Sequence, residues 1–281
     1  MRRLFVINAE DDKYGAQKEN VLIAFDENRD IQGVLCIYPF FAYDTEPEHP
    51  HNLYLHFHSK ESNRLVESVK DTLLEHGLQR AKEIKHEAGQ EKTRAYACFF
   101  EHQKDDISYF ESRGFKHDEG MYILERNSVE GIPNLEIPDG IEFEMWRMDT
   151  EEEQQKFIET HRKIFPRHPY SIQKMQELKM LLGWNNFTGF HGREIIGNIM
   201  VYVENTKDGI GHIEDLFVQK NWRRQGVAKM LLAMALKYFR EQNIYRIQLE
   251  MWSANKAALG LYQAYGFEKI RETDIAVGIY V

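Results

Sequence analysis

The chain has 281 residues, of which 42% are hydrophobic and 29% are charged, and its formal net charge at pH 7 is -9. This length predicts two domains, and the composition excludes a disordered chain. The negative charge argues against nucleic acid as the main partner, because phosphate binding needs a basic surface, and it is compatible with a cationic or amine substrate.

Two cysteines, Cys36 and Cys98, lie in apolar, strand-like runs. This number argues against a disulfide framework and favours a reducing compartment. No long apolar run follows Met1-Arg2-Arg3, so the sequence predicts no signal peptide. No apolar stretch reaches the length of a bilayer span. We therefore expect a soluble cytoplasmic protein that does not bind membranes.

Strands and helices alternate in the first part of the chain. Strands are predicted at Val21–Phe25, Ile31–Phe41, Asn52–His58, Thr93–Phe100 and Phe115–Glu125, and helices at Ser62–His86 and Asp105–Arg113. The residues before Val21 are too few for two further helices. A linker is predicted at residues 127–139, because Asn127–Gly140 holds two prolines and two glycines between periodic stretches. The expected domains are therefore residues 1–126 and 140–281.

The second domain repeats this pattern in a longer form. Strands are predicted at Ile141–Met148, Phe187–His191, Ile195–Val203, Ile210–Val218 and Tyr245–Met251 and from Phe267 to Val281, and helices at Glu151–Phe165, from Ser171 to about Leu182, at Val227–Glu241 and at Lys256–Tyr265. Pro166 ends the first helix, and Thr206–Gly209 forms a hairpin turn. This order predicts an α/β fold with a mixed sheet covered by helices. Tyr109–Phe115 echoes Leu261–Phe267, which indicates a duplication.

The strongest chemical signal lies in Ile213–Leu232. A strand ends at Val218, a short loop holds Arg223-Arg224-Gln225-Gly226, and a helix starts at once. Unpaired N–H groups in the first helical turn, together with the helix dipole, form an anion site, and arginines add charge-assisted bonds to phosphate. A plain helix N-terminus with solvated arginines is the alternative explanation.

Two segments resemble the GNAT superfamily of N-acetyltransferases. Arg223–Ala228 matches the Arg/Gln-x-x-Gly-x-Gly/Ala signature, and Asn255–Phe267 is similar to the Asn-x-x-Ala-x-x-x-Tyr-x-x-x-Gly-Phe segment. The resemblance covers roughly residues 141–281 and, in less detail, the first half. It implies two GNAT-like acyl-CoA N-acyltransferase domains in tandem, the first truncated and degenerate.

The resemblance also implies roles for individual residues. The loop Arg223, Arg224, Gln225, Gly226, Val227 and Ala228 would bind the pyrophosphate of coenzyme A. The strand ending at Leu216, Phe217 and Val218 would bulge and part from Leu249–Trp252, so that pantetheine pairs with the main chain and an N–H group faces the thioester oxygen. Asn255 would bond pantetheine or cap its helix. Tyr262 would protonate the departing thiolate, unless it is simply a core aromatic.

The general base is expected among carboxylates. Glu214 and Asp215 are neighbours on the central strand, where successive side chains face opposite sides, so only one of them is expected to face the substrate. Glu250 and a water chain are further candidates. We favour Glu214, and acid–base assistance of this kind is typically worth about 10²–10⁴-fold in rate.

The first copy departs from the pattern at both sites. Its corresponding loop, Ser59–Arg64, has no glycine, Glu61 would repel phosphate, and Phe110 stands where the second copy has Tyr262. We expect a structural or substrate-shaping half without activity. His49, His51, His56 and His58 cluster there, but no metal is expected. Trp184 and Trp222 either line a pocket or pack.

Together these features predict an N-acetyltransferase. An acetyl group would move from acetyl-CoA to a primary amine of a small molecule or peptide, by direct attack in a ternary complex. Cys36 and Cys98 lie in the degenerate half, so no covalent relay is expected. The alternatives are a non-catalytic acyl-CoA-binding or regulatory module and a structural, dimer-forming protein. The sequence leaves the acceptor, the acyl-chain length and a homodimer open.

Overall fold

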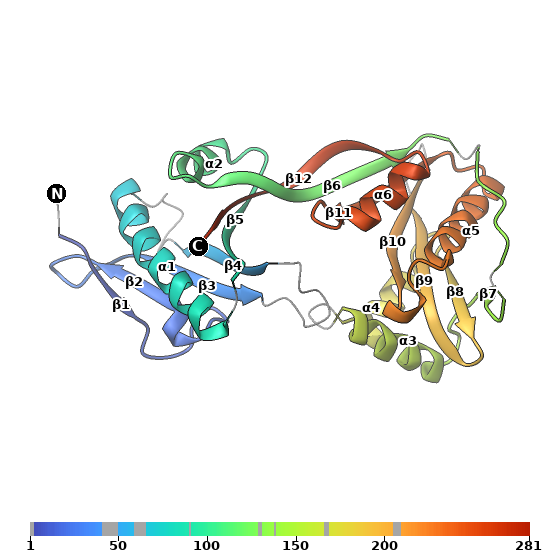
Figure 1. Ribbon diagram of the computed structural model, residues 1–281, viewed down its shortest axis with the longest axis horizontal. Helices are drawn as coiled ribbons and strands as arrows, with labels where there is room; N and C mark the ends of the chain where they lie inside the picture. Colours follow the sequence, from blue (N-terminus) through green and yellow to red (C-terminus); the bar gives the residue numbers. More distant parts are fainter. Residues whose placement is uncertain are drawn as a thin grey trace. The chain divides into compact units, whose positions relative to one another are not determined.

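A computed structural model of the chain describes residues 3–40, 50–58, 66–89, 91–128, 131–137, 139–165, 169–204 and 209–281. The chain divides into two compact units (Figure 1). The first unit consists of residues 1–120 and 273–281, and the second unit of residues 121–272. None of the helices in these described segments combines the length and the hydrophobicity that a bilayer crossing requires.

The first unit is built on a sheet with the strand order β1-β2-β3-β4-β5-β12. Its elements are β1 (Phe5–Asn8), η1 (Lys18–Asn20), β2 (Val21–Phe25), β3 (Ile31–Phe40), β4 (His51–His58), α1 (Glu67–Ala88), β5 (Thr93–Phe100), α2 (Lys104–Glu111) and the end of β12 (Glu268–Tyr280). β1 to β4 pair antiparallel, and β4 pairs parallel to β5. α1 packs across β2 and β3 and buries an apolar stripe that includes Leu73 and Ile84.

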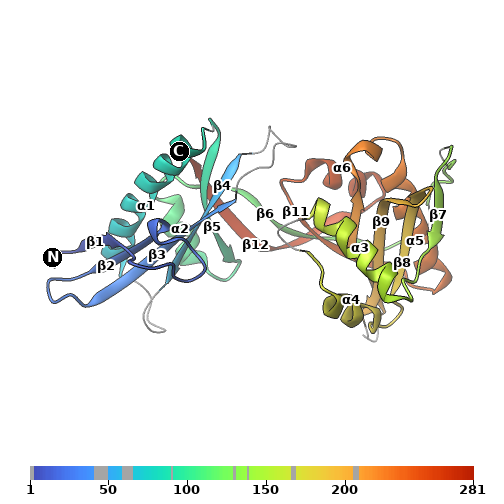
Figure 2. The ribbon, with the colours of Figure 1, turned by 90° about the horizontal axis from the view of Figure 1, so that it is seen from below.

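The second unit has the strand order β6-β11-β10-β9-β8-β7. Its elements are β6 (Lys116–Arg126, whose last residues lie here), β7 (Glu142–Met145), α3 (Glu151–Ile164), α4 (Ile172–Lys179), β8 (Asn185–His191), β9 (Glu194–Glu204), β10 (Ile210–Val218), η2 (Lys220–Trp222), α5 (Val227–Glu241), β11 (Arg246–Trp252) and α6 (Lys256–Ala264). Helices cover both faces of this sheet, α3 and α4 one face and α5 the other (Figure 2).

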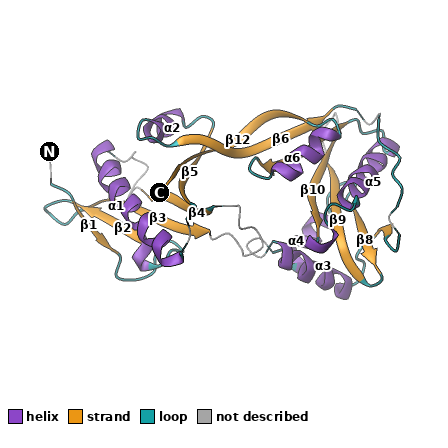
Figure 3. Ribbon diagram, in the orientation of Figure 1, coloured by secondary structure: helices purple, strands orange, loops and turns teal. Residues whose placement is uncertain are grey.

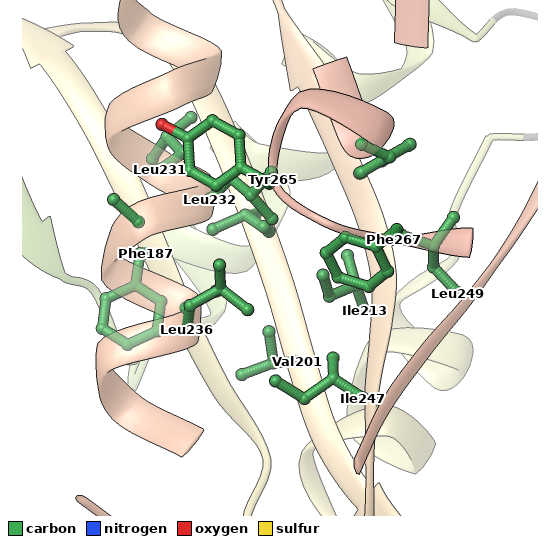
Figure 4. Close-up of a cluster of buried hydrophobic side chains, with 14 of the residues drawn as sticks. Phe187, Val201, Ile213, Leu231, Leu232, Leu236, Ile247, Leu249, Tyr265 and Phe267 are labelled. Carbon is green, nitrogen blue, oxygen red and sulfur yellow. The ribbon is translucent and has the colours of Figure 1, made fainter. Parts of the chain in front are cut away.

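Alternating side chains of β9 supply both cores of the second unit. Ile199 and Val201 belong to the cluster under α5, whereas Met200 belongs to the cluster under α3 and α4. Figure 4 shows the first of these clusters, in which Leu232 and Leu236 of α5 face Ile213 and Val201. This alternation is what a strand buried on both faces requires.

Capping side chains set the starts of three helices in the second unit. Thr150 and Glu153 form a capping box at α3, in which Thr150 Oγ1 accepts from Glu153 N–H at 3.2 Å. Ser171 Oγ accepts from Lys174 N–H at 3.1 Å and caps α4. Asn255 Oδ1 accepts from Ala258 N–H at 3.0 Å and caps α6. These bonds satisfy N–H groups that a helix start leaves unpaired.

The two units repeat one topology (Figure 3). In each, three antiparallel strands lead into a helix, a strand parallel to the third one, and a second helix. The first unit does this with β2-β3-β4-α1-β5-α2 and the second with β8-β9-β10-α5-β11-α6. The repeat agrees with the duplication expected from the sequence, and the mixed sheets agree with the expected α/β class.

The units are not contiguous in the sequence. Residues 121–126 of β6 pair with β11, so a strand that begins in the first unit ends in the second. Residues 274–280 of β12 pair with β5, so the last strand returns to the first unit. The boundary predicted at residues 127–139 separates the two repeats of the sequence. The two compact units of the structure have other bounds, because the last strand of each repeat extends into the other unit. Periodicity locates a strand but does not say which sheet it joins.

Other differences concern the element ends. β1 was not expected, because Phe5–Asn8 is too short to show a period. α4 ends at Lys179, earlier than about Leu182. Several expected features lie outside the described residues, namely His49, the loop Ser59–Arg64, Pro166, Thr206 and part of the linker.

Candidate functional site

The second unit contains a point at which two parallel strands part. β10 and β11 pair from Ile210↔Arg246 to Ile213↔Leu249. Beyond this point β10 pairs with β9 on its other side as far as Val218, and β11 pairs with β6 as far as Trp252. A bulge lies in β10 between Ile213 and Asp215. The bulge and the parting expected from the sequence are thus confirmed.

The backbone direction after the bulge follows from one hydrogen bond. Gln219 N–H donates to the carbonyl of Ile196 in β9 at 2.8 Å. The backbone N–H and C=O groups of successive residues point to opposite edges of a strand. The main-chain groups of Phe217 therefore also point to β9, whereas those of Leu216 and Val218 point to the edge from which β11 has parted. The main chain at Leu216 can therefore pair with a ligand that carries amide groups.

The loop that follows β10 ends at a helix start. Gly226 precedes α5 with φ of 86°, and a Cβ built on it meets nothing within 4 Å. The helical ladder begins with Met230 N–H donating to the carbonyl of Gly226 at 3.0 Å. The N–H groups of Val227 and Ala228 lie ahead of that bond and have no partner within the helix. Such a helix start, with its dipole, is suited to binding an anion.

The two arginines of the loop are exposed at this helix start. Arg224 has φ of 64°, a strained value for a residue other than glycine. Arg223 Nε donates to the carbonyl of Val218 at 3.2 Å, and Gln225 Nε2 donates to the carbonyl of Asn221 at 2.8 Å. The first bond ties the loop to the end of β10, and the second lies within the loop.

Tyr262 of α6 belongs to the core of the second unit. It is 7% exposed and packs edge-on against Phe267, with ring centroids 5.7 Å apart. Burial raises the pKa of the Tyr262 phenol, and the carboxylate of Asp215 raises it further. The phenol is therefore protonated at neutral pH. Asn255 at the start of the same helix serves as its cap.

Glu214 and Asp215 both interact with the helices of one face. Although Glu214 is exposed, neighbouring atoms desolvate its carboxyl group and raise its pKa, while Lys174 of α4 opposes this shift. Asp215 Oδ2 lies 3.3 Å from His161 Nε2 of α3. The expectation that only one of these carboxylates faces the substrate assumed an unbroken strand, and the bulge between Ile213 and Asp215 interrupts that alternation. Which of the two faces the substrate stays a prediction.

Sequence reasoning missed two residues at this place. His161 is 3% exposed, and Tyr170 stacks on its ring with centroids 4.2 Å apart. A signal for His161 existed, because it lies one helical turn after Phe157 on the apolar face of α3. Tyr170 lies in an irregular segment without any period, so no pattern marks it.

The first unit keeps the parting of its strands but has different side chains there. β4 and β5 pair from His51↔Thr93 to Tyr54↔Tyr96 and then separate. A cavity of about 420 Å³ lies beyond, with Lys70, Cys98 and Phe110 among its lining residues. Phe110 is 1% exposed and packs against Phe115 and Phe99. Phe110 has no group that can donate a proton.

The histidines of β4 interact with aromatic neighbours. The rings of His56 and His58 meet edge-on at 4.4 Å, and Tyr54 Oη lies 3.0 Å from His56 Nδ1. Burial lowers the pKa of His56. Among the residues that the structure describes, no three His, Cys, Asp or Glu side chains are grouped so that they could hold a metal.

Trp184 and Trp222 pack against the cores of the second unit. Trp222 contacts the cluster under α5, and the centroids of its ring and the His191 ring are 4.8 Å apart. Trp184 packs against the cluster under α3 and α4. Both side chains thus follow the packing alternative.

Comparisons with known proteins find a family that matches the second unit. The model of the Acetyltransferase (GNAT) family matches residues 146–267. N-alpha-acetyltransferase MAK3 of Arabidopsis thaliana is 32% identical over 100 residues, which are 35% of this chain and 53% of that protein. Thialysine N-epsilon-acetyltransferase of Caenorhabditis elegans is 28% identical over 92 residues, which are 32% of this chain and 58% of that protein. The chain thus spans about half the length of these curated relatives.

A solved structure that resembles nearly the whole chain shows the same fold. It is a GCN5-related N-acetyltransferase from Sphaerobacter thermophilus, with a TM-score of 0.50 and 13% identity. The likeness covers 95% of this chain and 82% of that one, so both units fall within it. At this identity the likeness concerns the fold alone.

Proposed function

We propose that this chain, whose residues 146–267 belong to the GNAT family of acetyltransferases, transfers an acetyl group from acetyl-CoA to a primary amine. The acceptor is a small molecule or a peptide, attacked directly in a ternary complex. One observation carries the proposal: β10 and β11 part directly beside the loop that starts α5. The free main-chain edge of β10 then lies next to the start of α5, which is suited to an anion. Coenzyme A fits both, because its amide-containing arm can pair with the edge and its pyrophosphate can bind at the helix start.

In this scheme each part of acetyl-CoA meets a different part of the site. The pyrophosphate lies on the N–H groups from Gln225 to Ala228, with the Arg223 and Arg224 side chains nearby. The pantetheine arm pairs with the main chain of Leu216 to Val218. Asn255, which caps α6, reaches the arm from the side of β11. The N–H group of Leu216 or Val218 then stabilises the negative charge that develops on the thioester oxygen.

The chemical step uses one acid and one base. The amine nitrogen bonds to the thioester carbon, the carbon–sulfur bond breaks, and its electron pair leaves with sulfur. Tyr262 gives its phenolic proton to the thiolate. Glu214 takes the proton that the amine loses, a role that suits a carboxyl group of raised pKa. The first copy, residues 1–126, takes no part in this step, since Phe110 replaces the phenol.

Thermal unfolding with and without acetyl-CoA tests the cofactor site. At 100 times the Kd, binding stabilises the fold by about 2.7 kcal/mol, which raises the Tm by roughly 5–10 °C. Gly226→Glu should abolish this shift. Gly209→Glu is the matched control. Gly209 also has a positive φ of 52°, and a Cβ added to it meets nothing within 4 Å, but it precedes β10 at the end far from the loop. Equal shifts in both variants would contradict the proposed loop.

Tyr262→Phe separates an enzyme from a non-catalytic acyl-CoA-binding module. In an enzyme that uses Tyr262 as the acid, kcat falls by about 10²–10⁴-fold while the acetyl-CoA shift in Tm survives. Release of coenzyme A across a panel of primary amines measures the first effect. If the wild type releases none with any amine and still binds acetyl-CoA, the binding module is the correct function.

A further inference from the structure

A buried carboxylate and a buried imidazole meet at the bulge of β10. Asp215 Oδ2 lies 3.3 Å from His161 Nε2, and their side chains are 11% and 4% exposed. The contact has the distance of an ion pair, but among the described residues Asp215 Oδ2 has no hydrogen-bond donor. A buried carboxylate oxygen without a donor is costly, so this group is suited to a ligand that brings N–H groups.

Aromatic rings fix the imidazole beside the carboxylate. Tyr170 stacks on His161 with an interplanar angle of 10°, and Phe165 lies 4.8 Å from the same ring. Phe217, two residues after Asp215, meets the imidazole edge-on at 6.0 Å. With aromatic side chains on several sides, the ring cannot turn away without breaking these contacts. This packing keeps Nε2 of His161 3.3 Å from Asp215 Oδ2.

Asp215 also lies within electrostatic reach of the proposed acid. Its charge raises the pKa of Tyr262 as well as that of Tyr170. In sequence it stands between Glu214, the proposed base, and Leu216, whose N–H group faces the parted strands. The carboxylate is therefore beside the place where the thioester and the amine meet in the proposed reaction.

We infer that Asp215 binds the ammonium head of the acceptor and that His161 is the positioning residue for Asp215. This inference rests on the proposed acetyl transfer for its catalytic meaning. Two neighbouring carboxylates then have two roles, set by their surroundings. Buried Asp215 holds the cation beside the thioester. Exposed Glu214 takes one proton from the ammonium before it attacks and releases that proton to solvent, so it is ionised again when the nitrogen loses its second proton as the amide forms. The acceptor is accordingly an amine that arrives charged.

Steady-state kinetics with the best amine of a primary-amine panel tests the role of Asp215. Asp215→Asn should raise the KM for the amine by about 10–100-fold, as expected for the loss of a charged hydrogen bond, and leave the KM for acetyl-CoA unchanged. Asp149→Asn is the matched control, because it is the same substitution in the same unit and the Asp149 side chain is 77% exposed. Equal effects of both variants would mean that net charge alone matters and would overturn the inference.

The positioning role of His161 has its own pair of variants. His161→Phe keeps the aromatic packing and removes the ring nitrogens, so it should raise the KM for the amine, as Asp215→Asn does. His161→Gln supplies an amide donor and should recover part of the loss. If both variants retain the wild-type KM for the amine and the acetyl-CoA shift in Tm, His161 has no positioning role.

A binding readout separates this inference from the proposed reaction. The imidazole resonances of His161, assigned with His161→Phe, are followed by NMR in the full chain. n-Butylammonium chloride should shift them in the wild type but not in Asp215→Asn, and tetramethylammonium chloride, which has charge but no N–H group, should not. The absence of a shift in the wild type overturns the inference. A shift without acetyl transfer to any amine would leave the ammonium site standing and remove the proposed reaction.

Discussion

Glu214 occupies the bulge of β10, between Ile213 and Asp215, which each have a partner on β9. Desolvation raises the pKa of this carboxyl group above its usual value, with Asp215 adding to the shift and Lys174 opposing it. As a base Glu214 must be ionised, so kcat/KM should rise with pH through that raised pKa and then level off. Glu214→Gln should lower kcat by about 10²–10⁴-fold and remove this limb of the pH profile.

The same shift has a consequence for stability. Because the folded pKa of Glu214 lies above the unfolded one, ionisation disfavours the fold, and stability is lost as pH rises through the raised pKa. Glu214→Gln should therefore unfold at a higher temperature than the wild type at neutral pH. The two should unfold alike near about pH 3, below both pKa values. If Glu214→Gln is still more stable than the wild type at low pH, the added stability comes from packing and not from the ionisation of Glu214.

Gly278 of β12 shows how tightly one residue can be constrained. A Cβ at this position would lie 2.3 Å from Nε of Arg94. Arg94 is fully buried, and its Nε donates to Asp118 at 3.0 Å. Gly278→Ala must displace a buried, paired guanidinium and should lower the free energy of unfolding of the first unit by about 3 kcal/mol.

Denaturant unfolding of Gly278→Ala, followed by amide exchange in the first unit, measures this loss. Gly260→Ala in α6 is the control, since nothing lies within 4 Å of its added Cβ. It should stabilise by about 0.5–1 kcal/mol, because alanine is the better helix former. A harmless Gly278→Ala would show that Arg94 can leave its position cheaply.

At the scale of the element, the capping box of α3 can be tested directly. Thr150→Ala removes the acceptor for Glu153 N–H and should cost about 1 kcal/mol, or roughly 2–4 °C in Tm. Thr150→Ser keeps the acceptor and should cost little. Because α3 carries His161, the Ala variant should also raise the KM for the amine if the end of the helix loosens.

Elements with a long period were the ones that the sequence predicted well. β10 and α5 begin and end at the predicted residues, because Val218 and Gly226 bound a strand and an amphipathic helix that are both strongly patterned. The parting of β10 from β11 came from resemblance and not from periodicity. The contact of His161 with Asp215 joins a helix to a strand far along the chain, and such pairs leave no trace in local patterns. The partner of β12 was hidden for the same reason.

At the scale of the whole molecule, the exchange of strands predicts an unequal response to truncation. Deleting residues 273–281 should unfold the first unit, although most of that unit lies before residue 121, because Ala276 and Val277 are fully buried beside β5. Limited proteolysis should then cleave within residues 66–111 faster than in the wild type. Lys269→Ala, in the part of β12 that belongs to the second unit, is the control and should leave cleavage unchanged.

The same exchange sets an order of events during synthesis. Residues 1–120 leave the ribosome well before the segment that completes their sheet, which is made about 150 residues later. At 5–20 residues per second this delay is roughly 8–30 s. During that time β5 presents an unpaired, apolar edge, the kind of surface that invites aggregation. The nascent first half should therefore depend on a chaperone that shields this edge until β12 arrives.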